Sequence, residues 1–228
     1  MTAIIPGATD ALEALLLQRH SCRGFKAEPV PRTTIERILT LAQHSASWCN
    51  SQPWQVMVTS GLATHRFREV MVTAAQETGP DPDYEFPIEY RGVYLERRRE
   101  CGLALYDAVG IRRGDRQASA HQAMDNFRFF GAPHVAVVTS DRLQSTYGAV
   151  DCGAYISNFM LAATSLGVAT IPQAALASRP KRVREFFGLS EDRLVVCGMS
   201  FGWADESHTA NGFRTGRAEI EDVASWFE

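Results

Sequence analysis

The segment from Asp151 to Leu166 constrains the fold most strongly, because it is apolar almost all round. The run predicts a helix that ends at Gly167, a residue suited to the left-handed backbone of a helix C-terminus. A helix that is apolar on nearly every face must be covered on nearly every face. The fold therefore has to surround this segment with other elements of the chain or with another subunit.

Three segments are predicted to be strands. Apolar and polar residues alternate from Trp54 to Thr59, which is typical of a strand with one buried face. The runs Val135 to Thr139 and Leu194 to Phe201 are continuously apolar, which is typical of strands buried on both faces. Because Trp54 begins the alternating strand, we expect its side chain to lie in the core.

Further helices are predicted between and beside these strands. Asp10-Ala11-Leu12-Glu13 and Thr33-Thr34-Ile35-Glu36 have the pattern of a helix start with a capping side chain. The first of these helices is expected to end near Arg19. Another begins at Ser178-Arg179-Pro180 and ends at Gly188. This order of elements predicts an α+β fold with one central sheet and helices packed around it.

Two segments fall outside this pattern. Residues 80–116 begin with Gly, Pro and Asp, are rich in charge and aromatics, and contain a predicted helix from about Tyr90 to Ala108. Such an insertion often covers a site as a lid, and a solvated surface helix explains its arginines equally well. The tail from Arg214 to Phe227 ends in apolar residues, so we expect it to dock on its own domain or on a partner. We treat residues 1–228 as a single domain.

Composition excludes several classes of function. The net charge of −3 gives no indication of a nucleic-acid partner, and no apolar run approaches the ~18–20 residues of a membrane span. Five cysteines are scattered singly, without the spacing of a zinc site, so no metal is predicted. With no secretion signal visible at the start, the unpaired cysteines favour a cytoplasmic location.

A cluster of cations and hydroxyls follows the first predicted helix. Arg19, His20, Ser21 and Arg23 stand close together in the sequence. Guanidinium groups make paired hydrogen bonds to phosphate oxygens, and hydroxyl and backbone N–H groups complete such a site. A second polar turn, residues 50–53, carries amides that suit the polar edge of a flat ring. Together they predict a phosphate-bearing cofactor.

Several motifs along the chain resemble those of the FMN-dependent nitroreductase family, and they occur in the family's order. They are Arg19-x-Ser21-x-Arg23-x-Phe25, Ser47-x-x-Asn50-x-Gln52-Pro53-Trp54, Phe130-Gly131-Ala132-Pro133, Ile171-Pro172-Gln173, Gly198-x-x-x-Gly202-Trp203 and Arg214-x-x-Arg217. The resemblance spans about residues 12 to 226. It implies a mostly antiparallel sheet flanked by helices, in an intertwined homodimer with FMN at the subunit interface. It also implies hydride transfer from NADH or NADPH by a ping-pong cycle.

The resemblance also implies which residues hold the cofactor. Arg19, Ser21, Arg23 and Arg217 are expected at the FMN phosphate, with Arg214 as a possible fourth cation. The remaining positions are expected around the flavin ring: His20, Ser47, Trp48, Asn50, Gln52, Asn126, Pro172, Gln173 and Ala174. Of these, Ser47, Asn50 and Gln52 are expected to reach the ring from the other subunit. Trp48 is also expected to narrow the substrate site or to stack on a bound aromatic.

No protein nucleophile is predicted, because the hydride chemistry belongs to flavin N5, which a backbone N–H of the 172–174 loop is expected to contact. That loop has no hydroxyl side chain, which favours two-electron transfer. Cys22 and Cys49 lack an identified base, so we interpret both as packing residues. The leading hypothesis is an NAD(P)H-dependent reductase of nitroaromatics or quinones. The alternatives are a reductive dehalogenase or flavin-cleaving enzyme of the same fold, and a flavin-binding sensor or storage protein without turnover.

Overall fold

The computed structural model describes residues 5–77 and 79–228, and its centre is an antiparallel sheet in the order β1-β2-β4-β3. The strands are Gln55–Ser60 (β1), His134–Asp141 (β2), Ala169–Gln173 (β3) and Arg193–Gly202 (β4). Every neighbouring pair is antiparallel, and β2 carries a register shift against β4 between Val138 and Thr139. The predicted α+β class with a mostly antiparallel sheet is confirmed.

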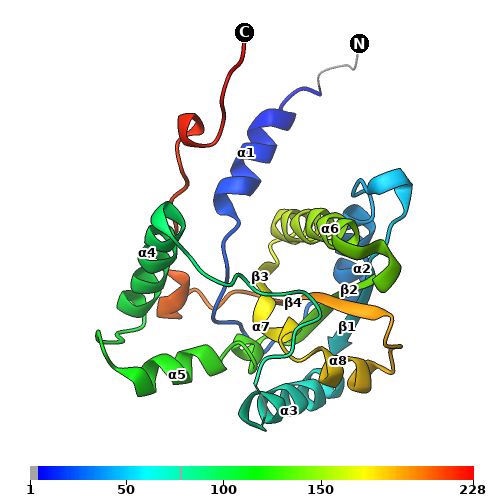
Figure 1. Cartoon of the computed structure of the whole chain (residues 1–228), viewed down its shortest axis with the longest axis vertical. Coiled ribbons are helices and arrows are strands. Elements are labelled where there is room, and N and C mark those ends of the chain that lie inside the picture. The colour runs from blue at the N-terminus through cyan, green and yellow to red at the C-terminus, as the bar shows by residue number, and fades with distance from the viewer. Residues whose placement is uncertain (1–4, 78) are drawn as a thin grey trace.

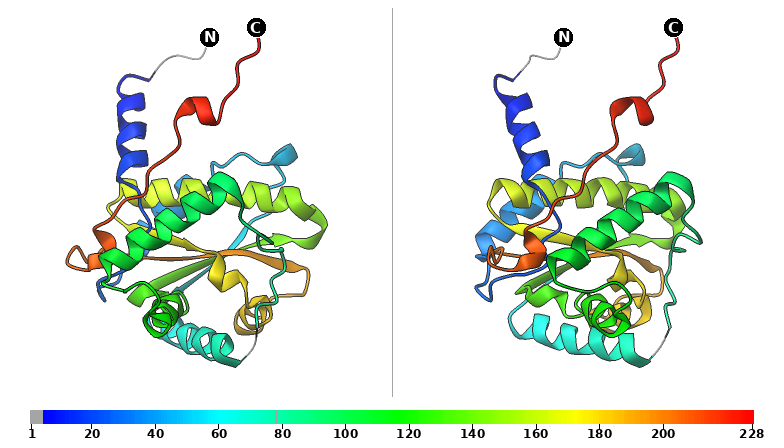
Figure 2. Two further views of the ribbon diagram at one scale, coloured as in Figure 1. Left: turned by 60° about the vertical axis from the view of Figure 1, so that its left-hand side comes forward. Right: turned by 90° about the vertical axis from the view of Figure 1, so that its left-hand side faces the viewer.

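Helices cover both faces of this sheet (Figures 1 and 2). Strand β2 explains why, because successive side chains of a strand point to opposite faces. Ala136 and Val138 pack with α2 (Arg32–Ala42) and α6 (Ser145–Ser165), whereas Val135 and Val137 pack with α3 (Leu62–Glu77) and α8 (Pro180–Phe187). The middle of β2, residues 135–138, is buried on both faces, which is why this part of its sequence is continuously apolar.

Helix α6 begins six residues before the predicted start, and one side of it is open. Tyr155 and Phe159 are buried against the sheet, and Trp54 packs on Tyr155 with ring centroids 5.1 Å apart, which confirms Trp54 as a core residue. On the other side, Gly153, Ala154 and Ser157 are exposed. The chain alone therefore covers one face of the helix that the sequence requires to be covered on nearly all sides.

Two arms project from the body of the molecule (Figures 1 and 2). The first is α1 (Ala8–Gln18), which has no buried residue although it carries Leu12, Leu16 and Leu17. The second is the C-terminal tail, in which Trp226 and Phe227 are at least 85% exposed. Docking of the tail end on its own domain is therefore wrong for the described structure, and docking on a partner stays a prediction.

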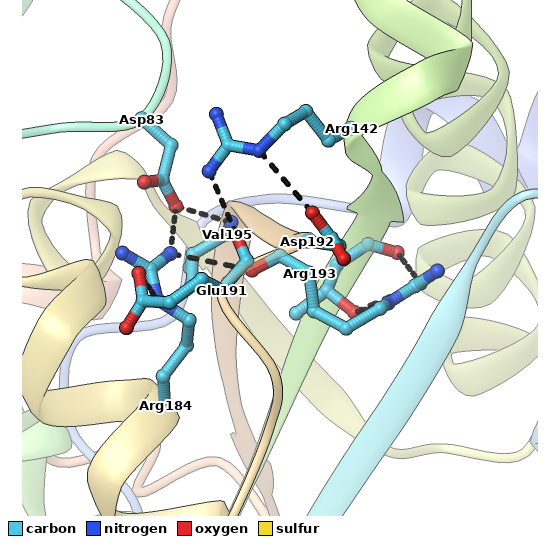
Figure 3. A network of polar contacts seen from close by, with 8 residues as sticks. Asp83, Arg142, Arg184, Glu191, Asp192, Arg193 and Val195 are labelled. Atoms are coloured by element: carbon cyan, nitrogen blue, oxygen red, sulfur yellow. Dashed lines mark hydrogen bonds and ion pairs between the residues drawn. The ribbon is translucent and has the colours of Figure 1, made fainter.

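The segment 80–116 is attached to the body at its beginning. The Asp81 N–H donates to the carbonyl of Ser178, and the Asp83 carboxylate accepts from the Arg184 guanidinium and from the Val195 N–H (Figure 3). The chain then continues into α4 (Gly92–Ala108), close to the predicted helix bounds, and α5 (Arg116–Met124). The sequence did not predict α3 or α5.

Local details of several predictions are wrong. Helix α1 starts at Ala8 after Gly7, not at an Asp10 cap, and α2 starts at Arg32 with no side-chain cap. Glu36 pairs with Arg32 instead of capping the helix. Pro172 and Gln173 belong to β3 and Ala174 begins α7 (Ala174–Ala177), so the expected loop is the end of a strand. In the described part of the chain, no helix is long and apolar enough to cross a membrane.

Candidate functional site

Residues from both ends of the chain line one cavity of about 420 Å³. The segment after α1 contributes Arg19, His20, Ser21 and Arg23, and the C-terminal segment contributes Arg214 and Arg217. Cys101 of α4 closes one side. The structure thus brings together the five residues that the sequence assigned to a phosphate, with His20 beside them, although nearly 200 positions separate the two groups.

The sheet and one asparagine hold the N-terminal segment in place. Ser21 forms a β-bridge with Thr170 of β3, and the Cys22 N–H donates to the Thr170 carbonyl at 3.0 Å. The Oδ1 of buried Asn211 accepts from the Arg23 N–H at 2.7 Å, and its Nδ2 donates to the Gly24 carbonyl at 2.9 Å. Sequence reasoning missed Asn211, because no local pattern links it to residues some 190 positions away.

The guanidinium groups of this cavity bond to neutral acceptors. Arg23 donates to the Ser21 carbonyl, Arg214 to the carbonyls of Asn211 and Phe213, and Arg217 to Thr215 and Gly216. None of the ion pairs among the described residues involves these arginines or Arg19. The lining of this cavity holds four cations and no carboxylate, which favours an anion there.

The pKa values of two of these arginines are lowered. Burial, followed by the charge of Arg217, lowers the pKa of Arg19, and burial lowers the pKa of Arg23. The Arg23 guanidinium also lies over the Phe213 ring, 5.7 Å from its centroid. A dianion in the cavity would relieve the mutual repulsion and supply the missing acceptors, because charge-assisted bonds to phosphate are strong.

The side chain of Gln173 is occupied inside the protein. It is 2% exposed, its Oε1 accepts from the Ser200 hydroxyl, and its Nε2 donates to the Asn126 carbonyl at 2.8 Å. The structure therefore brings Gln173 and Asn126 together, and it leaves only the backbone of Gln173 for a ligand. Pro172 is half-buried and Ala174 is exposed, so this end of β3 presents an accessible strip.

The second predicted turn forms a compact polar loop, residues 47–52. Ser47 Oγ accepts from the Gln52 N–H at 3.0 Å, and Gln52 Nε2 donates to Asn50 Oδ1 at 3.1 Å. Cys49, Asn50 and Gln52 all have positive φ, a conformation that costs roughly 1 kcal/mol for each residue with a Cβ. This loop is held in a strained shape by its own bonds and by contacts with α6.

One chain does not bring this loop to the arginine cavity. The Trp48 N–H bonds to Asp151 in the first half of α6, whereas Ser21 bonds to β3, which follows the C-terminal end of α6. Asp151 and Ser165 are 14 positions apart in α6, which corresponds to about 21 Å of helix at ~1.5 Å per residue. The 47–52 segment and the end of α1 therefore lie near opposite ends of α6 (Figure 1).

The cysteines do not form a reactive set. Cys22 is fully buried, and burial raises its pKa to about 11, which confirms a packing role. Cys49 is exposed, so its interpretation as a packing residue is wrong for the single chain. Within residues 5–77 and 79–228, no cluster of three His, Cys, Asp or Glu side chains is arranged to hold a metal ion.

Comparison with known proteins identifies the class. Residues 16–203 match the model of the Nitroreductase family. Nitroreductase NfnB of Mycolicibacterium smegmatis is 37% identical over 215 residues, which cover 94% of this chain and 92% of that protein. A 4-nitrobenzoate reductase of Pseudomonas putida is 32% identical, with 92% of each chain covered. The chain belongs to the nitroreductase family.

Solved structures agree with this assignment. The crystal structure of the FMN-dependent NfnB from Mycobacterium smegmatis in complex with NADPH superposes with a TM-score of 0.92 at 36% identity, covering 96% of this chain and 99% of that one. An FMN- and NADPH-dependent NfnB from a strain of Sphingopyxis gives a TM-score of 0.91 at 30% identity, with 96% and 99% covered.

Proposed function

We propose that this protein is an FMN-dependent oxidoreductase that transfers hydride from NAD(P)H to nitroaromatic, quinone or similar electron-poor acceptors in a ping-pong cycle. The cavity lined by unpaired arginines from both ends of the chain is the observation that carries this proposal. When bound with its phosphate in this cavity, FMN would supply the two-electron chemistry. Relatives that reduce nitroaromatic compounds support the acceptor class.

The arginine cavity fits the phosphate of FMN. Arg19, Arg23 and Arg217 supply three cations, Arg214 a fourth, and the Ser21 hydroxyl a further donor. The lining of this cavity contains no carboxylate, although Glu100, Glu219 and Asp222 line a second cavity that shares Arg214 and Arg217. A dianionic ligand among the arginines would balance their charge. His20 lies in the same cavity and is assigned a backbone contact to the ring.

The end of β3 fits the flavin edge. Ala174 is the first residue of α7, so its N–H has no acceptor within that helix. Together with Pro172 and the backbone of Gln173, it is assigned to the edge that carries N5. Asn126 is assigned beside it, because its carbonyl already holds the Gln173 side chain. No protein residue is assigned as a nucleophile.

We also propose a homodimer with the cofactor site at the subunit interface. The exposed small residues of α6, the projecting helix α1 and the apolar tail are surfaces that a second copy would cover. The length of α6 supports this arrangement, since the 47–52 loop reaches an arginine cavity only if that cavity belongs to the other subunit. Residues 80–116 are assigned as the lid of the site, and the five free cysteines support a cytoplasmic location.

Arginine substitutions test the phosphate site. A charge-assisted bond contributes about 1.5–3 kcal/mol, so Arg23→Ala and Arg217→Ala should each weaken FMN binding by at least about tenfold and yield largely colourless protein. Arg32→Ala is the matched control, because Arg32 is exposed, pairs with Glu36 and does not line the cavity. Full FMN occupancy in both cavity variants would show that the phosphate lies elsewhere.

Anaerobic spectroscopy separates an enzyme from a flavin-binding sensor. NADPH or NADH should bleach the visible flavin band of the purified protein, and a nitroaromatic should restore it. A flavin that neither nicotinamide reduces would overturn the proposed activity and favour the sensor. The same experiment with each nicotinamide in turn gives the preferred reductant.

A further inference from the structure

The 47–52 loop needs an external anchor to keep its shape. Three of its residues, Cys49, Asn50 and Gln52, adopt left-handed backbone angles although none is glycine. Such conformations persist only when the surroundings over-determine them, and they concentrate where a protein pre-organises a site. The contacts that hold this loop from outside include those of Trp48 with α6.

Asp151 of α6 supplies the anchor for the backbone. Both of its carboxylate oxygens lie within 3.2 Å of the Trp48 N–H, and the residue is only 8% exposed. No ion pair among the described residues involves Asp151. A buried carboxylate without a cation is costly to maintain, so the Trp48 N–H, its one hydrogen-bond donor among the described residues, is a strong constraint on the loop.

Tyr147 supplies the anchor for the side chain. It lies four residues before Asp151, so the two project from the same side of α6. The Tyr147 and Trp48 rings meet edge to face with centroids 4.5 Å apart, and both residues remain 59% exposed. One helix thus fixes the backbone of Trp48 through Asp151 and its ring through Tyr147.

We propose that Asp151 is a positioning residue for the reaction, which sets where the 47–52 loop meets the cofactor and acceptor of the other subunit. This inference depends on the proposed dimeric flavin site. Helix α6 presents its open face to the second subunit and holds the loop at its N-terminal half. Asp151 therefore fixes the position of Trp48 relative to α6, and through α6 relative to the other subunit.

Substitutions of Asp151 test this role by comparing two kinetic constants, the KM for the acceptor and the rate of flavin reduction by NADPH. In Asp151→Ala, we expect KM for a nitroaromatic acceptor to rise at least about tenfold and the visible circular dichroism of bound FMN to change. Asp151→Asn keeps an acceptor oxygen toward the Trp48 N–H, so it should stay within about threefold of wild type. The rate of flavin reduction by NADPH gives an independent readout on the same samples.

Asn158→Ala is the matched control. Asn158 also lies on α6, and its Nδ2 donates to Ser45 Oγ at 2.8 Å, so it contacts the segment just before the loop without holding Trp48. We expect this variant to keep the acceptor KM of wild type. If Asp151→Ala does not fold, Tyr147→Ala replaces it, because Tyr147 is exposed and contacts the Trp48 ring. Tyr147→Ala should raise the acceptor KM, whereas Tyr147→Phe, which keeps the ring, should leave the acceptor KM unchanged.

The outcomes separate the inference from the function on which it rests. Wild-type protein that binds no FMN refutes the proposed function. Wild-type protein that turns over, with a lower melting temperature but unchanged KM and flavin dichroism in Asp151→Ala, refutes the positioning role and leaves the function intact. An equal rise in KM in Asp151→Ala and Asn158→Ala would also refute it.

Discussion

The buried ion pair between Asp83 and Arg184 attaches the 80–116 segment to the sheet, and its loss should be measurable. The Asp83 carboxylate accepts from Arg184 at 2.6 Å and from the Val195 N–H of β4 at 2.8 Å (Figure 3). Both side chains are at most 10% exposed. Asp83→Ala leaves the guanidinium and the Val195 N–H without this acceptor.

The size of the effect follows from this burial. Removing one partner of a buried ion pair costs roughly 3–5 kcal/mol. Arg184 keeps Glu191 at 3.3 Å and the Arg193 carbonyl, so we expect the lower end, about 3 kcal/mol. With an unfolding entropy of about 2.1 cal/mol/K per residue, a chain of 228 residues should melt about 6 °C lower.

Calorimetry or urea unfolding at fixed protein and FMN concentrations measures this change. The matched control is Asp192→Ala, which removes the exposed Arg142–Asp192 pair seen beside it in Figure 3 and should cost less than about 1 kcal/mol. The double variant Asp83→Ala/Arg184→Met should recover much of the lost stability, because it leaves no buried charge unpaired and Glu191, which loses Arg184, is exposed. Equal destabilisation by Asp83→Ala and Asp192→Ala would refute the reasoning.

Two further predictions concern buried titratable groups. His134 Nε2 accepts from the Val30 N–H at 2.9 Å, and burial lowers its pKa below the ordinary value of ~6.5, so its contribution to stability is present above that pH and is lost as the pH falls toward the folded-state pKa. Urea unfolding of wild type and His134→Gln at ~pH 7.5 and ~pH 5.5 tests this, and an equal loss in both would contradict it. Burial raises the pKa of Cys152 to about 12 and that of Cys197 to about 11, so both thiols should react with a disulfide reagent only after unfolding. Rapid modification of either in the native protein would contradict this prediction.

The strands and the α+β class could be predicted because burial leaves a direct trace in the sequence. Residues 135–138 of β2 are all apolar since both faces of that strand are covered, whereas its ends carry His134, Thr139, Ser140 and Asp141. Strand β1 alternates in its sequence but not in its burial, because Val56 and Val58 pack against one core cluster and Met57 against the other. Helices whose sequences lack a clear apolar face, such as α5, were not predicted. Strand β3 was read as a loop because it is short and contains Pro172, which is accommodated there by the sheet.

The sequence by itself also determined the chemistry of the candidate site. Arginines and a serine can be assigned to a phosphate wherever they lie, because the preference of guanidinium for phosphate is local and intrinsic. For the same reason, the family motifs assign residues to the cofactor without reference to their neighbours in space, and this assignment stays a prediction.

Only the tertiary structure decided which of these residues meet. The arginines at the two ends of the chain line one cavity, because the Ser21–Thr170 bridge and Asn211 join segments nearly 200 positions apart. The same structure turned the Gln173 side chain inward and fixed Trp48 on Asp151, at the far half of α6. Sequence patterns indicate which local structure and which ligand chemistry a residue favours. The distances between remote segments are set by the packing of the whole sheet and its helices.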